Sequence, residues 1–231
     1  MPPQRASTLT PANGMLPATP GLLKDRAYTE LKRRITTGDY APGCFLAERQ
    51  LAEDLGMSKT PVKAALERLE HEGFITISPQ QGIVVRSLSI AEIADQYEIR
   101  MALESFTVRM LAGKLTPSQV AQVRANLAAQ KKLTQKPDVL AAVKLDADFH
   151  QLFIELLGNQ EILSVMVQLR DKMGMVISTV FQSHPNRFES SYVEHLAISE
   201  AVISGDGLSA AKLIEAHLEY GKMLILTRRP R

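Results

Sequence analysis

Three histidines and one aspartate in the second half of the chain have the side-chain types of a transition-metal site. Asp146 and His150 are four residues apart, which places them on one face of a single helix. His195 and His217 lie further along, on two other predicted helices. Together they offer three imidazoles and one carboxylate, a set suited to zinc, manganese, nickel or iron. A histidine taken singly on a helix is more often packed or half-exposed than a ligand, so spacing alone leaves both interpretations open.

A second group of residues has the chemistry of DNA recognition. Lys59 and Lys63 are four residues apart and share one face of a predicted helix with the hydroxyl of Thr60. The apolar stripe that can dock this helix on a small core consists of Val62, Leu66 and Leu69. A short helix with basic, hydroxyl-bearing first turns and a buried opposite face suits the major groove of DNA.

The segments around this helix predict a winged helix-turn-helix. Two helices precede it, over residues 22–37 and 48–55, and Gly56 provides the turn into it. After it, the apolar runs 74–77 and 83–85 flank a turn, which indicates a β-hairpin, or wing.

Gly82 lies at the expected tip of this wing, where the absence of a Cβ lets the backbone approach a phosphate or the minor groove. The alternative is a winged helix that makes only protein contacts. The exposed residues are basic and polar rather than apolar, which favours DNA. Between residues 22 and 86 there are 10 Lys and Arg against 9 Asp and Glu, and the whole chain carries a net charge of +2. The DNA interpretation therefore depends on where the charges lie, not on their number.

From residue 89 onward, strand signals give way to successive amphipathic helices with short breaks between them. These helices are expected at residues 89–112, 117–135, 138–157, 160–182, 187–204 and 208–228. They predict an antiparallel bundle, an architecture that places ligand sites in its core. The predicted fold is thus mainly α, with a disordered tail over 1–21, the winged helix-turn-helix over 22–86 and the helical bundle over 89–229.

Composition narrows the compartment and the class of function. The single cysteine, Cys44, excludes an internal disulfide, fits a reducing cytoplasm and is expected to be a packed side chain rather than a sensor. No apolar stretch approaches the ~18 residues of a membrane span, so we expect a cytoplasmic protein with no membrane partner. No nucleophile–base pairing, phosphate-binding loop or nucleotide fingerprint is evident, so we expect no enzymatic activity.

The first half resembles a known family. Residues 46–52 (LAERQLA), 56–66 (GMSKTPVKAAL) and 69–73 (LEHEG) are similar to the DNA-binding domain of GntR-type bacterial transcription regulators. The resemblance implies that the operator contacts are Arg49, Lys59, Thr60, Lys63 and the wing glycine Gly82. The family usually has arginine where this chain has the two lysines, and lysine lacks the planar fork that grips guanine bidentately. Arg49 keeps that fork and is the expected guanine contact.

The second half is similar to the ligand-binding FCD domain in the FadR-type branch of the same family. The matching motifs are DADFHQLF at 146–153, GN at 158–159, EH at 194–195 and AHL at 216–218. The resemblance implies a divalent metal bound by Asp146, His150, His195 and His217. Zinc is expected first, with manganese or nickel as alternatives. The resemblance also implies an effector beside the metal, usually a small organic acid.

Arg100 matches an arginine that the family often keeps near this pocket, where it could clamp a carboxylate bidentately. The alternative is a surface arginine paired with Glu104 at i+4.

We therefore expect a metabolite-responsive repressor of a catabolic operon that binds a palindromic operator as a homodimer. A small carboxylate effector near the metal would shift the orientation of the DNA-binding heads. Two alternatives stay open. One is a sensor in which the metal itself is the effector, and the other is a metal-dependent hydrolase.

Overall fold

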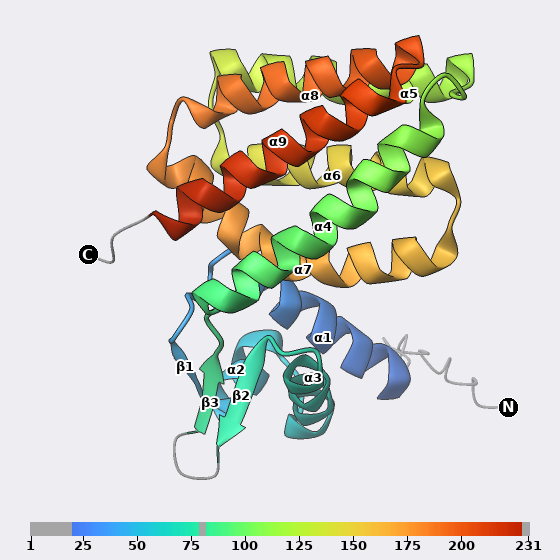
Figure 1. The fold of residues 1–231 in the computed structure, drawn as a ribbon. Coiled ribbons are helices and arrows are strands. Elements are labelled where there is room, and N and C mark those ends of the chain that lie inside the picture. Colours follow the sequence, from blue (N-terminus) through green and yellow to red (C-terminus); the bar gives the residue numbers. More distant parts are fainter. Residues whose placement is uncertain (1–19, 79–81, 228–231) are drawn as a thin grey trace, which may run out of the picture.

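The structure, a computed structural model, describes residues 20–78 and 82–227 of the 231-residue chain. They form a small N-terminal head and a larger bundle of helices (Figure 1). The predicted disordered tail, residues 1–21, lies outside the described residues as far as residue 19, and Pro20 already begins the first helix. Within the described ranges, no helix is long and apolar enough to cross a membrane.

The head has the predicted winged helix-turn-helix architecture. Its elements are α1 (Pro20–Thr36), β1 (Phe45–Leu46), α2 (Glu48–Leu55), α3 (Lys59–His71), β2 (Ile75–Ser78) and β3 (Gly82–Val85). The strands form an antiparallel sheet in the order β1-β3-β2. The sequence prediction missed β1, because two residues between turns carry no alternating pattern. Residues 79–81, in the predicted wing, lie outside the described residues.

Packing inside the head turns the basic face of α3 outward. α3 buries Val62, Leu66 and Leu69 in a core shared with α1, as the apolar stripe predicts. Gly56 ends α2 with a φ of 61°, a left-handed conformation that favours glycine and sets the turn into α3. Ser58 occupies the N-cap position of α3, but its side chain makes no capping hydrogen bond.

The bundle follows the predicted order of helices. Its elements are α4 (Ile90–Leu111), α5 (Pro117–Gln135), α6 (Val139–Leu157), α7 (Gln160–Ser183), α8 (Arg187–Ser204) and α9 (Gly207–Leu226). Side-chain caps explain why the first residues of these helices were predictable. Ser89 and Glu92 form a capping box on α4, and the Asn159 side chain accepts from two backbone N–H groups at the start of α7.

The interior of the bundle is apolar around a polar centre. α4 and α9 lie side by side across one face, and α6 packs behind α4 (Figure 1). Phe149, Ile198, Val202 and Leu218 are among the side chains buried between the helices. Because α6, α8 and α9 all face this interior, polar residues on them can meet there.

α7 connects the bundle to the head. Lys32 on α1 places its Nζ 2.6 Å from Asp171 Oδ2 of α7 and 2.9 Å from Glu72 Oε2 at the end of α3. Nearby on α7, a Cβ added to Gly174 would lie 3.8 Å from the carbonyl oxygen of Thr36. A Cβ would fit here in ordinary van der Waals contact, so α1 and α7 lie close together without requiring glycine at this position.

Candidate metal centre and DNA-binding surface

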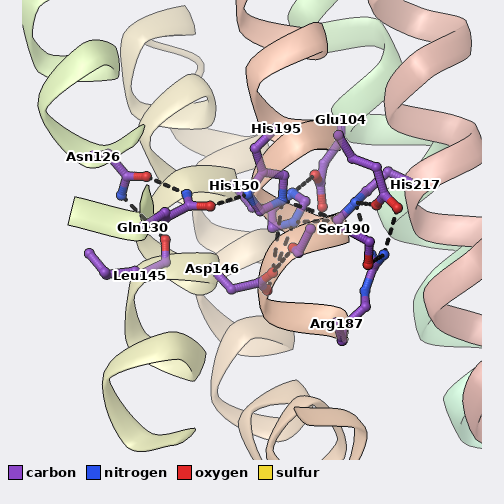
Figure 2. Close-up of polar contacts among 12 residues, drawn as sticks. Glu104, Asn126, Gln130, Leu145, Asp146, His150, Arg187, Ser190, His195 and His217 are labelled. Carbon is purple, nitrogen blue, oxygen red and sulfur yellow. Dashed lines mark hydrogen bonds and ion pairs between the residues drawn. The ribbon is translucent and has the colours of Figure 1, made fainter. Parts of the chain in front are cut away.

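Four side chains from three helices meet in the interior of the bundle (Figure 2). Asp146 and His150 come from successive turns of α6, His195 from α8 and His217 from α9. All four are buried, and one ligand atom from each lies within 4.8 Å of the others. The structure thus brings together the four residues that the sequence motifs grouped, and we call them the His/Asp cluster.

Each imidazole of this cluster is oriented by an oxygen on a neighbouring helix. The Nδ1 pairs are His150 with Glu104 Oε2 at 2.5 Å, His195 with Gln130 Oε1 at 2.8 Å and His217 with Glu194 Oε2 at 2.6 Å. The Gln130 amide is held in turn, because its Nε2 donates to Asn126 Oδ1 at 2.6 Å (Figure 2). The oxygen acceptors assign the proton to Nδ1 of His150 and His195. Arg187 Nη2 also lies 3.1 Å from His217 Nδ1, but the shorter contact with the Glu194 carboxylate assigns the proton to that Nδ1 as well, so each Nε2 keeps a free lone pair.

These lone pairs make the cluster fit a cation. His217 Nε2 lies 3.3 Å from His195 Nε2 and 3.2 Å from His150 Nε2, although none of the three has a proton to donate. Asp146 completes the set, with oxygens 3.8 Å from His195 Nε2 and 3.9 Å from His150 Nε2. Two ligands of a tetrahedral zinc lie about 3.3 Å apart, because each Zn–N bond is about 2.0–2.1 Å. A cation between these atoms would remove the repulsion of the lone pairs.

The surroundings also keep the imidazoles in the form that binds metal. Burial lowers the pKa of His195 well below its ordinary value. Burial likewise lowers the pKa of His217, although the hydrogen bond to Glu194 opposes the change. Neutral imidazole is the ligand form, so these shifts suit a metal site.

Arg100 lies beside the cluster. Its side chain is buried, and its Nε donates to Glu104 Oε1 at 2.7 Å, while the other oxygen of Glu104 contacts His150. The i+4 pairing with Glu104 therefore exists, but inside the bundle and not on the surface. Burial alone would raise the pKa of Glu104; Arg100 and His150 outweigh that effect and hold the pKa at about 2.

A small cavity of ≈ 30 Å³, the polar cavity, lies beside the cluster. Its polar lining consists of Tyr97, Arg100, Asp146, Arg187 and His217. A ligand in this cavity would meet two guanidinium groups, a phenol and two members of the cluster at once.

The residues predicted to contact an operator lie on the head. Those exposed on α2 and α3 are Arg49, Lys59, Thr60 and Lys63. Gly82 begins β3 with a φ of 78° and is exposed at the wing. Arg49 and Lys59 line one open groove over the turn between α2 and α3. Arg49 Nε contacts Glu53 Oε1 at 2.9 Å with both side chains largely exposed, a weak pairing that a phosphate or a guanine can displace.

Known protein families match both the head and the helical bundle. The family described as bacterial regulatory proteins, gntR family, matches residues 23–85, and the FCD domain matches residues 95–220. The chain belongs to the GntR family.

Named relatives cover most of this GntR-family regulator. The HTH-type transcriptional repressor RspR of Escherichia coli strain K12 is 28% identical over 197 residues, 85% of this chain and 86% of that protein. The Nta operon transcriptional regulator of Aminobacter aminovorans is 29% identical over 182 residues, 78% and 83% of the two chains. The predicted family is confirmed, and the chain is a transcription regulator of GntR and FCD type.

Solved structures show the same fold. Escherichia coli McbR/YncC matches with a TM-score of 0.76 at 22% identity, over 88% of this chain and 96% of that one. A putative GntR regulator from Rhodococcus sp. RHA1 matches with a TM-score of 0.78 at 21% identity, over 89% and 99%. The predicted fold class, a winged helix-turn-helix followed by a helical bundle, is confirmed.

The sequence prediction for this GntR-family chain missed the groups that orient the imidazoles. Glu104 was considered as a surface partner of Arg100 and Glu194 as part of the EH motif, and neither was expected to accept a hydrogen bond from an imidazole. Gln130 lies 65 residues before the histidine it contacts, so no local pattern could have indicated it. Tyr97, in the lining of the polar cavity, was likewise not predicted.

Proposed function

We propose that this chain is a metabolite-responsive repressor of a catabolic operon, acting in the bacterial cytoplasm. The supporting observation is that one chain carries an exposed basic helix and a buried cluster of three imidazoles and a carboxylate. One relative is named a transcriptional repressor, and another is named for the Nta operon. In this proposal, residues 22–86 bind DNA, and residues 89–229 bind the effector and dimerise.

Asp146, His150, His195 and His217 would hold a divalent metal, with zinc as the first candidate and manganese or nickel as alternatives. Imidazole and carboxylate ligands suit all three ions. When bound, the ion would supply a Lewis acid, and an oxygen of the effector could complete its coordination. The protein's own contribution is orientation, because the acceptors on Nδ1 aim every Nε2 at the same point.

Arg100 would bind the carboxylate of the effector. Glu104 accepts a hydrogen bond only from the Nε of Arg100. Among the described residues, the two terminal nitrogens of Arg100 have no hydrogen-bond partner. A guanidinium with free terminal N–H groups beside a metal centre is suited to a carboxylate. This supports a small organic acid as the effector.

Arg49 would contact a guanine, and Lys59, Thr60 and Lys63 would contact phosphates and base edges from the first turns of α3. Gly82 would let the wing approach the DNA backbone. The exposure of all five residues, and the groove that Arg49 and Lys59 share, support this assignment.

An exposed apolar surface supports a homodimer. On α4 the exposed apolar side chains include Ile99, Phe106 and Met110, and on α9 they include Leu213, Tyr220 and Met223. α4 and α9 lie side by side (Figure 1). We propose that these exposed side chains contribute to one patch, the α4/α9 patch. The same patch on two copies would pair around a twofold axis, which matches a palindromic operator.

The hydrolase alternative has less support. Asp148 Oδ1 accepts from Arg170 Nη2 at 2.5 Å, and Glu194 contacts both His217 and Arg187 at 2.6 Å. A general base must be available to accept a proton from water. Asp148 and Glu194 are therefore both engaged, and we propose that the chain is not an enzyme.

The test is operator binding by zinc-loaded and chelated protein, measured by fluorescence anisotropy on a site selected from random DNA. We expect an organic acid to weaken operator binding by metal-loaded protein about 5–150-fold. Chelated protein should not respond to the acid. His150→Ala, which removes one ligand, should behave like chelated protein, and the exposed His71→Ala should behave like wild type.

Failure to select any DNA sequence would contradict the proposal. A second outcome would favour the metal-sensor alternative: operator affinity that follows the free metal concentration with no acid present.

A further inference from the structure

The C-terminal end of α3, the helix proposed to enter the major groove, lies at the junction between the head and the bundle. α3 ends at His71, and Glu72 and Gly73 follow it before β2 begins at Ile75. A cationic side chain of the head contacts each of these two residues, and each cation also contacts a helix of the bundle. α3 is therefore attached to the bundle at the end opposite to its basic first turns.

Lys32 of α1 makes the first of these bridges. Its Nζ lies 2.9 Å from Glu72 Oε2 and 2.6 Å from Asp171 Oδ2 of α7. Nζ also donates to the Tyr28 hydroxyl at 2.7 Å and lies 4.8 Å from the centre of the Phe74 ring. Burial alone would lower the pKa of Lys32, but the hydrogen bonds to these oxygens outweigh burial and raise it, so the side chain stays charged. These partners hold the ammonium group between α3 and α7.

Arg86, the first residue after β3, makes the second bridge. Its Nη1 donates to the carbonyl oxygen of Gly73 at 3.3 Å, and its Nη2 donates to Glu92 Oε1 of α4 at 2.6 Å. The other oxygen of Glu92 accepts from the backbone N–H of Ser89 at 2.8 Å, within the capping box of α4. The backbone N–H of Arg86 donates to the Phe74 carbonyl at 2.9 Å. This bridge therefore connects the end of the head to the first turn of α4.

Gly73 leaves room for the second bridge. Its φ of 80° lies in the left-handed region that favours glycine, and a Cβ added there would lie 3.0 Å from Arg86 Nη1. Another residue at this position would strain the turn after α3 and displace the guanidinium from the carbonyl that it contacts.

The two bridges restrain a short connection between head and bundle. Residues 87–89 join Arg86 to α4, and Leu88 among them packs against the core of the bundle. A short connection can act as a hinge unless other contacts fix it. Among the ion pairs formed by the described residues, Lys32 with Asp171 and Arg86 with Glu92 are the two that join the head to the bundle.

We propose that Lys32 and Arg86 are positioning residues that fix the orientation of α3 and thereby set the spacing of half-sites that the regulator accepts. Two heads bind a palindrome when the distance and angle between their major-groove helices match its half-sites. Rigid attachment favours one spacing, whereas flexible attachment lets the heads reach several. This inference rests on the proposed homodimer, because spacing has a meaning only for two heads on one DNA.

The test replaces the two carboxylates of the bundle and leaves the head unchanged. In the double variant Glu92→Gln/Asp171→Asn both bridges lose their charge, while glutamine at residue 92 can still complete the capping box. Full-length protein is measured by fluorescence anisotropy on palindromes built from a half-site selected from random DNA. The half-sites are moved apart or together by one and two base pairs, and DNA with a single half-site is measured beside them.

Wild-type protein should bind one spacing most tightly. In the double variant, the ratio of affinities between that spacing and one two base pairs longer should fall roughly tenfold, because four modest ion pairs, two in each protomer, act together. Affinity for the single half-site should stay at the wild-type level, since the head is unaltered. Glu155→Gln/Glu161→Gln, which removes two exposed carboxylates elsewhere in the bundle, should keep the wild-type spacing profile.

A wild-type spacing profile in Glu92→Gln/Asp171→Asn overturns the inference, and so does an equal loss of affinity at every spacing. Wild-type protein that sediments as a dimer yet binds all spacings equally overturns this inference alone. Wild-type protein that selects no DNA sequence contradicts the proposed function instead.

A variant of the head tests the first bridge from its other side. Lys32→Met removes the charge and should broaden the spacing profile. Arg33→Met, at the exposed neighbouring residue of α1, removes the same charge and should lower the affinity for every spacing by one factor. Melting followed by circular dichroism checks that both variants are folded. A Lys32→Met protein with the spacing profile of Arg33→Met would show that Lys32 does not position α3.

Discussion

The orientation of the three imidazoles depends on residues that would not touch a metal themselves. Gln130 is the informative case, because it is uncharged and its amide is held by Asn126. Its loss leaves the buried Nδ1–H of His195 without an acceptor and lets the ring rotate. The arrangement of Nε2 atoms would then be less well preorganised for an ion.

Gln130→Ala should therefore lower zinc affinity about 10–100-fold. Competition with a chromophoric chelator measures this. Gln122→Ala, on the exposed side of the same helix, is the matched control and should leave the affinity unchanged. Equal affinities for both variants would show that Gln130 does not support the site.

For individual residues, spacing along the chain was enough to predict part of the candidate site. Asp146 and His150 share a helix face, so their proximity follows from the helical repeat. Residue type alone suggested grouping them with His195 and His217, but assigning all four to one metal required the family resemblance, since no local pattern links residues on different helices. The acceptors could not be predicted because their contacts depend on tertiary packing.

Among the helices, α7 contacts both the interior of the bundle and the head. Met173 and Ile177 line a small cavity beside Arg100, while Asp171 and Gly174 face α1 of the head. A ligand that moves α7 would therefore also move the surface on which α1 rests. This gives the proposed coupling a physical route between effector and DNA.

Asp171→Asn removes the negative charge 2.6 Å from Lys32 Nζ. We expect the ratio of operator affinities without and with acid to fall several-fold, while acid binding itself stays at the wild-type level. Anisotropy on operator DNA and calorimetry with the acid measure the two quantities. Glu161→Gln, at the exposed start of α7, is the control. An unchanged ratio in Asp171→Asn would exclude this ion pair from the coupling.

The elements themselves were largely predictable because their ends carry local signals. Ser89 with Glu92, Asn159 and Gly56 mark helix ends through caps and a left-handed turn. β1 had no such signal, since its pairing with β3 depends on a segment almost 40 residues away. The contact between α1 and α7 is equally non-local and was not predicted.

For the whole molecule, the α4/α9 patch sets the expected assembly. Placing a charge at its centre should prevent two copies from packing together. Phe106→Glu is therefore expected to sediment as a monomer and to bind a palindromic site more weakly than wild type. Leu140→Glu, at an exposed apolar residue on α6, should remain dimeric. A dimeric Phe106→Glu protein would place the interface elsewhere.

The order of the ligands along the chain has a consequence during synthesis. The head ends before residue 90, but the last of the four clustered residues, His217, lies on α9, the final described helix. During synthesis the complete DNA-binding head therefore emerges from the ribosome before His217, the last residue of the cluster, has been added. Protein interrupted before α9 would carry the operator-binding surface without the metal ligand set or part of the α4/α9 patch. Under the proposed function, such fragments would bind single half-sites without responding to the effector, so removal of incomplete chains would preserve the response.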